Sequence, residues 1–80
     1  MTQQEILESL KPIFREVFDN DSIDIMETTT ADDIEGWDSF NHINLIIAVE
    51  NRFRIKFQVA EIEDLRNVGE LARLIGKKVS

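Results

Sequence analysis

Residues 37–53 read WDSFNHINLIIAVENRF, a run that predicts one helix beginning at Asp38 or Ser39 and ending near Phe53. Apolar residues fall on more than one face of this helix, so it is predicted to be central and largely buried. They are Phe40, Ile43, Leu45, Ile46, Ile47, Val49 and Phe53. The first turn of a helix has unpaired backbone N–H groups and a partial positive charge, so a phosphate on Ser39 would be stabilised there. An Asp-Ser pair before a helix is, however, more often a simple cap.

An amphipathic helix is also predicted near the N-terminus, where a single apolar stripe recurs at spacings of one, three and four. The stripe consists of Ile6, Leu7, Leu10, Ile13, Phe14, Val17 and Phe18. Thr2 and Glu5 have the spacing of a capping box, which predicts the start of the helix. Pro12 removes one helical hydrogen bond, so we expect a kink or a restart of the helix there.

The segment 19–38 lacks periodicity and is rich in Asn, Asp, Ser, Thr and Gly, which predicts a long connecting loop. Long loops in compact domains are usually functional or disordered. Four apolar residues are scattered through it, and some of them are expected to hold the loop over the core. These are Ile23, Ile25, Met26 and Ile34.

Two further elements follow the central helix. Residues 54–57 alternate and could pass for a strand, but a lone strand has no partner, so they are interpreted as a connector with Ile55 and Phe57 turned inward. Residues 59–64 are predicted to form a brief helical turn.

A last helix is predicted from about Asn67 to Ile75, with Asn67 and Glu70 as its cap and Gly76 as its stop. Lys77 and Lys78 suit the negative end of its dipole. The predicted fold class is all-α, a four-helix bundle of three longer helices and one short helix with a long first loop.

Size and charge limit the function. Eighty residues predict a single domain over 1–80 with one core. The formal charge of −7 disfavours nucleic acid and anionic membranes as partners and favours proteins with basic patches. No apolar run approaches the roughly 20 residues of a membrane span and no secretion signal is evident, so a cytoplasmic location without membrane insertion is expected. The protein is also expected to be a monomer. The chain has no cysteine, so any thiol must come from an added group.

Asp38-Ser39-Phe40 resembles the Asp-Ser-Leu signature of acyl carrier proteins. The similarity extends over almost the whole chain, because the long first loop, the acidic run before the motif and the later helices follow the family's order and spacing. The resemblance implies that Ser39 receives 4′-phosphopantetheine from coenzyme A through a separate magnesium-dependent phosphopantetheinyl transferase. The thiol of that arm would carry an acyl group as a thioester, for fatty acid or polyketide biosynthesis, and the protein itself would not be an enzyme.

The resemblance also implies an acyl pocket beside the central helix. The matching residues are Leu45, Ile46, Val49, Phe57, Ile62, Leu65 and Leu71. Ordinary core packing is the favoured interpretation for most of them. Phe57 and Leu71 are bulky, so the pocket is expected to be shallow or suited to a short or polar cargo.

Partner binding is expected to depend mainly on acids before and after the central helix, with Glu50 the one acid that keeps this role on the helix itself. Acyl-loading and acyl-transfer enzymes with basic patches would contact Asp33, Glu35, Asp38, Glu50 and Glu61. Fatty-acid carriers usually show several acids on this helix, whereas here the positions predicted to be exposed are mostly uncharged: Asn41, His42, Asn44, Glu50, Asn51 and Arg52. This departure favours a dedicated, specialised pathway.

The same residues allow other interpretations. A small acidic protein-interaction domain would use Ser39 only as a cap. A hydrolase with a Ser39–His42 dyad lacks an evident orienting group and oxyanion site, so His42 is interpreted as a surface or partner-contact residue and Trp37 as a packing anchor. A calcium loop beginning at Asp19 is rejected, because Asp24 stands where the motif needs glycine.

Overall fold

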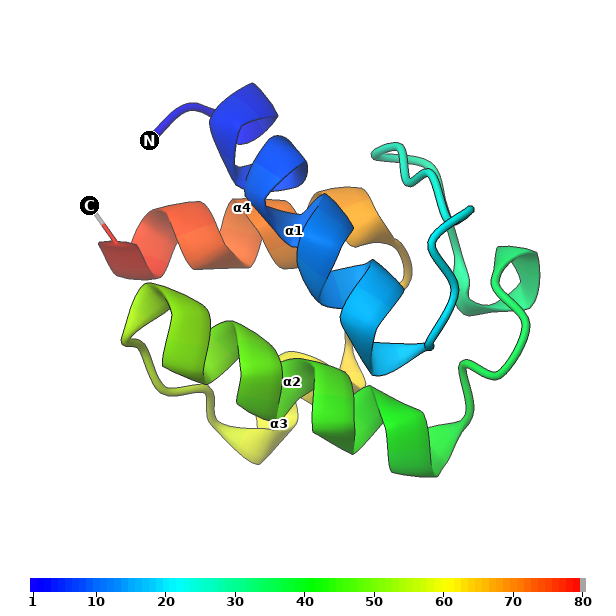
Figure 1. The fold of residues 1–80 in the computed structure, drawn as a ribbon. Helices are drawn as coiled ribbons and strands as arrows, with labels where there is room; N and C mark the ends of the chain where they lie inside the picture. Colours follow the sequence, from blue (N-terminus) through cyan, green and yellow to red (C-terminus); the bar gives the residue numbers. More distant parts are fainter. Residues whose placement is uncertain (80) are drawn as a thin grey trace.

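The computed structural model describes residues 1–79 and consists of helices and loops in that range. The elements are α1 (Gln3–Val17), η1 (Ala31–Asp33, a 3₁₀ helix), α2 (Ser39–Phe53), α3 (Val59–Glu63) and α4 (Val68–Val79). Helix α1 packs against both α2 and α4, and the long loop before α2 runs along one side of the bundle (Figure 1). The predicted all-α class, with three longer helices, one short helix and a long first loop, is confirmed.

Helix α1 begins with the predicted capping box. The Thr2 hydroxyl accepts a hydrogen bond from the Glu5 N–H (3.1 Å), and the Glu5 carboxylate accepts one from the Thr2 N–H (2.8 Å). The helix continues through Pro12 to Val17, so the predicted alternative of a restart near Pro12 is wrong. Phe14, two residues later, is fully buried, and this packing compensates for the backbone hydrogen bond that proline cannot make.

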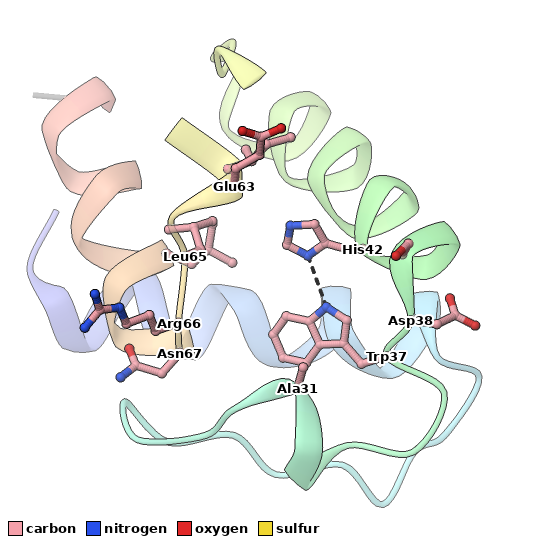
Figure 2. Close-up of a pocket in the computed structure, with 11 residues that line it drawn as sticks. Ala31, Trp37, Asp38, His42, Glu63, Leu65, Arg66 and Asn67 are labelled. Carbon is pink, nitrogen blue, oxygen red and sulfur yellow. Dashed lines mark hydrogen bonds between the residues drawn. The ribbon is translucent and has the colours of Figure 1, made fainter. Parts of the chain in front are cut away.

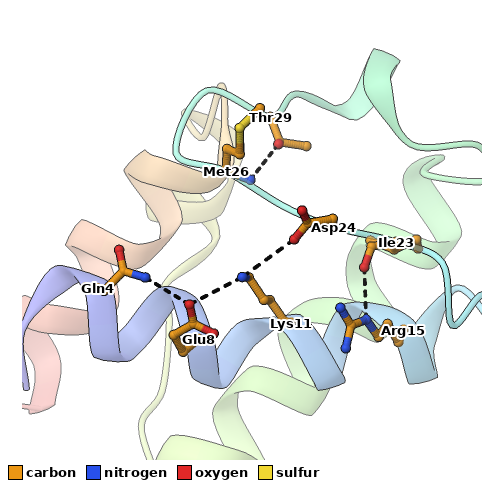
Figure 3. Close-up of polar contacts among 8 residues, drawn as sticks. All are labelled: Gln4, Glu8, Lys11, Arg15, Ile23, Asp24, Met26 and Thr29. Carbon is orange, nitrogen blue, oxygen red and sulfur yellow. Dashed lines mark hydrogen bonds and ion pairs between the residues drawn. The ribbon is translucent and has the colours of Figure 1, made fainter.

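Three of the four scattered apolar residues hold the long loop on the core. Ile23, Ile25 and Ile34 are buried, whereas Met26 is 62% exposed. The loop is also tied to α1 by polar contacts, because the Arg15 Nε donates to the Ile23 carbonyl at 2.9 Å (Figure 3). The loop is therefore part of the folded structure and fixes the approach to α2.

The same loop caps the first turn of α4. The Val68 N–H donates to the Thr29 carbonyl and the Gly69 N–H to the Glu27 carbonyl, each at 2.8 Å. Asn67 adds the predicted side-chain cap, since its Oδ1 accepts from the Glu70 N–H at 2.9 Å. Backbone groups that a helix start leaves unpaired are thus satisfied by the carbonyls of Glu27 and Thr29, in a segment far earlier in the chain.

Replacing Gly69 with alanine is expected to destabilise the protein by about 1–3 kcal/mol. A Cβ at this position would lie 2.8 Å from the Glu27 carbonyl oxygen and 3.1 Å from the Glu27 Cβ, so the loop would have to move away from α4. Urea unfolding followed by circular dichroism measures the change. Gly76→Ala is the matched control, because its Cβ would meet Ile6 at 3.4 Å; equal losses for both variants would contradict the close packing of the loop on Gly69.

Two sequence predictions about the helices need correction. Helix α2 is not largely buried: Leu45, Ile46 and Val49 are in the core, but Phe40, Ile43 and Ile47 are 73%, 56% and 50% exposed. The helix lies at the edge of the bundle (Figure 1), and these three side chains are on its exposed face. Helix α4 does not stop at Gly76 but continues to Val79, because Val79 packs against the core.

The helices of residues 1–79 all fall short of the length and apolar character that crossing a bilayer requires.

Candidate functional site

Ser39 is the first residue of α2, and its side chain is exposed. The cap of this helix is supplied by the preceding residue, since the Asp38 Oδ1 accepts a hydrogen bond from the Asn41 N–H at 2.9 Å. The Ser39 hydroxyl has no hydrogen-bond partner within residues 1–79. Asp38 therefore performs the capping role that an Asp-Ser pair usually serves, and the serine oxygen is left free for chemistry.

A tight turn sets the entry into α2. Gly36 has a φ of +88°, a conformation that favours glycine. Its carbonyl accepts from the Asn41 Nδ2 at 2.7 Å and from the Asp38 N–H at 2.9 Å. These bonds hold the Gly36 turn against the first turn of α2. The position of Ser39 is therefore fixed by the residues before it and after it in the chain.

An aromatic cluster holds this turn on the bundle. The Trp37 ring packs edge-on against Phe14, with centroids 5.4 Å apart, and lies 5.9 Å from the Phe18 ring. Its other neighbour is the His42 imidazole, which it stacks on at 6.1 Å and to which its Nε1–H donates at 3.1 Å. Trp37 is the predicted packing anchor. His42 is only partly exposed, because one side of its ring is covered by this contact with Trp37, and its contact with a partner stays a prediction.

A cavity of about 380 Å³ lies beside Ser39, between α2, the α3–α4 segment and the long loop (Figure 2). Its lining combines apolar side chains with several polar ones: Ala31, Trp37, Asp38, Ser39, His42, Ile62, Glu63, Leu65, Arg66, Asn67 and Leu71. This volume is at the lower end of the range for small-molecule sites.

The cavity includes three of the seven residues predicted to form an acyl pocket, namely Ile62, Leu65 and Leu71. The other four lie outside its lining. Leu45 and Val49 are fully buried and Ile46 is 5% exposed, while Phe57 packs on the edge of the core. These four side chains fill the bundle in this structure, as expected from the core-packing interpretation.

The site fits a phosphodiester-linked group. The Ser39 oxygen is accessible, the α2 N-terminus offers unpaired N–H groups and a partial positive charge, and a cavity opens next to the serine. No hydrogen bond joins Ser39 to His42 within the described chain, so the two residues do not form a nucleophile–base pair in this structure.

Most of the acids predicted to bind partners also make contacts within the protein. The Glu50 carboxylate accepts from the Phe57 N–H at 2.9 Å, and the Asp33 carboxylate accepts from the Thr30 N–H at 2.9 Å. Asp38 caps α2. Glu35 is exposed and has no such contact in the part of the chain that the structure describes. Their contact with partners stays a prediction.

Glu61 combines two local contacts that lower the pKa of its carboxyl group. The Gln58 N–H at 2.7 Å is the larger cause, and the Lys78 ammonium at 3.0 Å adds to it. Because the pKa of the folded state lies below the ordinary value of 4.5, these contacts stabilise the fold above that pH, and the contribution is lost as the pH falls through the folded-state pKa.

Glu61→Gln is therefore expected to reduce the acid sensitivity of the fold. The drop in Tm between pH 7 and pH 3 should be smaller than in wild type by a few degrees at most, because the pair is on the surface. Thermal melts at both pH values measure it. Glu63→Gln removes an exposed acid from the same helix and serves as the control; an identical pH response for both variants would contradict the role of Glu61.

Sequence interpretation missed two parts of the site. One is the exposed apolar face of α2, formed by Phe40, Ile43 and Ile47, whose spacing of three and four residues was already a signal of a single face. The other is the hydrogen bond between Trp37 and His42, for which a spacing of five residues across a helix start gives no signal. Within residues 1–79, no group of three or more His, Asp or Glu side chains is arranged to hold a metal ion.

Comparisons with known proteins agree with this geometry. The family model described as the phosphopantetheine attachment site matches residues 8–75. An acyl carrier protein of Thermosynechococcus vestitus is 34% identical over 84 aligned positions, which cover 100% of this chain and 99% of the relative. An acyl carrier protein of Thermotoga maritima is 28% identical over 98% of this chain and 96% of its own length. The solution structure of a holo acyl carrier protein from Geobacter metallireducens is similar, with a TM-score of 0.87 and 51% identity over 91% of this chain and 84% of that one.

Proposed function

We propose that this chain, which belongs to the acyl carrier protein family, carries its covalent 4′-phosphopantetheine group on Ser39. The protein is a carrier and not an enzyme, and the family works with phosphopantetheinyl transferases and acyl-handling enzymes. The observation that supports Ser39 is its free, exposed hydroxyl at the start of α2, where the cap is provided by Asp38. The family assignment decides against an interaction domain without a prosthetic group and against a hydrolase.

Attachment requires that the transferase reach the hydroxyl of Ser39. The Ser39 Oγ attacks the phosphorus that bears the pantetheine portion of coenzyme A, the new O–P bond forms as the bond to the departing nucleotide bisphosphate breaks, and the hydroxyl proton passes to a base of the transferase. The α2 N–H groups and helix dipole stabilise the resulting phosphodiester charge. When bound, the group supplies a terminal thiol that holds an acyl chain as a thioester.

Peptide mapping tests the proposed position. The protein is incubated with coenzyme A, magnesium and a broad-specificity phosphopantetheinyl transferase, then digested and fragmented in a mass spectrometer. We expect one added arm, located on Ser39 and absent from Ser9, Ser22 and Ser80. An arm on another serine would overturn the assignment of Ser39, whereas an unmodified protein would overturn the proposed function.

We also propose that the cargo is short or polar and belongs to a specialised pathway. The cavity beside Ser39 is small and partly polar. Leu45 and Val49 are fully buried by their neighbours, so the core beside α2 has no open space for a long acyl chain. Standard fatty-acid elongation enzymes should accept the loaded protein poorly, measured as the initial rate of chain extension. Ready extension to long chains would overturn this proposal.

The exposed apolar face of α2 is proposed to contact the transferase and the acyl-handling enzymes. Ile43 lies one turn after Ser39 on the same side of the helix, so an enzyme that reaches the serine would cover it. Apolar anchors at the centre of an interface contribute more than its charged rim, and the acids around α2 would steer basic partners.

Ile43→Asp is expected to lower the kcat/KM of arm transfer about tenfold, because one central apolar contact is worth roughly 1–2 kcal/mol. Initial rates with the transferase measure it. Asn44→Asp adds the same charge at the neighbouring exposed position and should change the rate much less. Equal effects of both variants would mean that charge alone, and not the apolar face, decides recognition.

The remaining proposals concern the state of the protein in the cell. We propose that residues 1–80 form one carrier domain that works as a cytoplasmic monomer, in line with its strong negative charge. Light scattering after size exclusion and cell fractionation test these proposals, and a stable dimer or a membrane-bound pool would contradict them.

A further inference from the structure

The imidazole of His42 is fixed in one tautomer by its neighbour. The indole Nε1–H of Trp37 is a donor only, so the His42 Nδ1, 3.1 Å away, must accept and cannot carry the proton of the neutral ring. The proton of the neutral imidazole is therefore on Nε2. The Trp37 ring is itself held by Phe14 and Phe18, so the donor that sets the tautomer has little freedom to move.

The protonated nitrogen of His42 faces the cavity beside Ser39. Figure 2 shows the second ring nitrogen directed away from Trp37, toward the space between α2 and the segment that carries Glu63 and Leu65. Neither of these residues, nor any other within residues 1–79, accepts a hydrogen bond from it. The cavity thus contains an N–H donor, fixed in direction by Trp37, that the protein does not use for its own structure; Arg66 and Asn67 bring further N–H groups to the lining from the segment before α4.

The cavity combines an apolar wall with polar side chains, a setting that suits a carbonyl group on a carbon chain. Ile62, Leu65 and Leu71 provide an apolar lining on the side of α3 and α4, and His42 lies one turn after Ser39 on α2. Ligand sites commonly pair such an apolar wall with a few oriented polar groups. A chain attached at Ser39 that folds into this cavity would bring carbonyl oxygens past the Nε2–H.

We propose that His42, oriented by Trp37, is a hydrogen-bond donor in the cavity that binds a carbonyl oxygen of the prosthetic arm or of its acyl cargo. This inference rests on the proposed attachment at Ser39. A carbonyl of the arm at this donor would hold the arm against the protein whatever its cargo, whereas a carbonyl of the cargo would make His42 a determinant of cargo, because it gains a bond that an alkyl chain cannot make. Trp37 is a positioning residue that acts through the imidazole.

Nitrogen-15 NMR of the imidazole tests the inference on four forms of the intact protein. They are the unmodified protein, the form with a free thiol, the form loaded from acetyl-coenzyme A and the form loaded from the ethyl thioether of coenzyme A, which lacks the cargo carbonyl. Intact mass first establishes loading. In the unmodified protein we expect Nε2 protonated and Nδ1 unprotonated.

A carbonyl bound to Nε2–H should shift its resonance and slow its exchange with solvent by roughly two- to tenfold. A change already present with the free thiol or the thioether identifies an amide carbonyl of the arm, and a change confined to the acetyl form identifies the cargo. Loaded forms that leave Nε2–H as in the unmodified protein would overturn the inference while the mass still supports attachment. A failure to load would overturn the proposed function and the inference with it.

Two variants separate hydrogen bonding from packing. Trp37→Phe keeps an aromatic ring but removes the indole donor, so both tautomers should be populated and the loading-dependent change should shrink. His42→Gln keeps a side-chain N–H donor at a similar distance from the backbone and should retain slowed exchange of its amide on loading. A single Nε2–H tautomer that persists in Trp37→Phe would contradict the positioning role of Trp37.

Discussion

Ser39→Ala should abolish attachment of the arm completely. The variant removes the oxygen that forms the phosphodiester bond, and neither Ser9 nor Ser22, the other serines within residues 1–79, lies at the start of a long helix with a cavity beside it. Intact mass after incubation with coenzyme A and the transferase should show one added arm on wild type and none on the variant. Loss of modification should be all-or-none rather than partial.

The control for this prediction is Ser22→Ala, which changes another exposed serine and should be modified like wild type. Folding must also be preserved. Asp38 supplies the α2 cap and Ser39 makes no hydrogen bond within residues 1–79, so Ser39→Ala should change the free energy of unfolding by no more than about 0.5 kcal/mol. A modified Ser39→Ala protein would show that the arm is attached elsewhere.

The order of the helices could be predicted because the capping residues in the sequence mark helix starts that the folded structure also contains. Thr2 with Glu5 and Asn67 with Glu70 marked two helix starts, and both caps form. The end of α4 was not predictable from Gly76, since glycine is compatible with a helix interior and Val79 gains core packing beyond it. Pro12 likewise did not interrupt α1, because burial of the residues around it outweighs the loss of one hydrogen bond.

The position of Ser39 was predictable, but its surroundings were not. A short signature at a helix start is enough to predict Ser39 as the attachment residue, whereas the cavity depends on how α2, the α3–α4 segment and the loop meet. Apolar residues on α2 looked like core because periodicity does not tell which faces of a helix have neighbours. Only the packing shows that Phe40, Ile43 and Ile47 are exposed.

Phe14→Ala should destabilise the protein by about 3–5 kcal/mol, the usual cost of truncating a fully buried phenylalanine. A domain of 80 residues has a total stability of about 4–12 kcal/mol, so this variant should be close to unfolded at 37 °C. Urea unfolding at low temperature, followed by circular dichroism and Trp37 fluorescence, measures the change. The functional consequence follows from the same contact, because Phe14 packs edge-on against the Trp37 ring and so supports the turn that presents Ser39.

Phe40→Ala is the matched control, since it truncates the same side chain at a position that is 73% exposed and should change stability by no more than about 0.5 kcal/mol. The two variants compare a phenylalanine in the core with a phenylalanine on the exposed face of α2. Phe14→Ala should lose structure and, through it, the Trp37–His42 hydrogen bond, whereas Phe40→Ala should keep both and affect only recognition by partners. Comparable destabilisation by the two substitutions would mean that the outer face of α2 is packed in solution, and the proposed docking role of that face would then have to be abandoned.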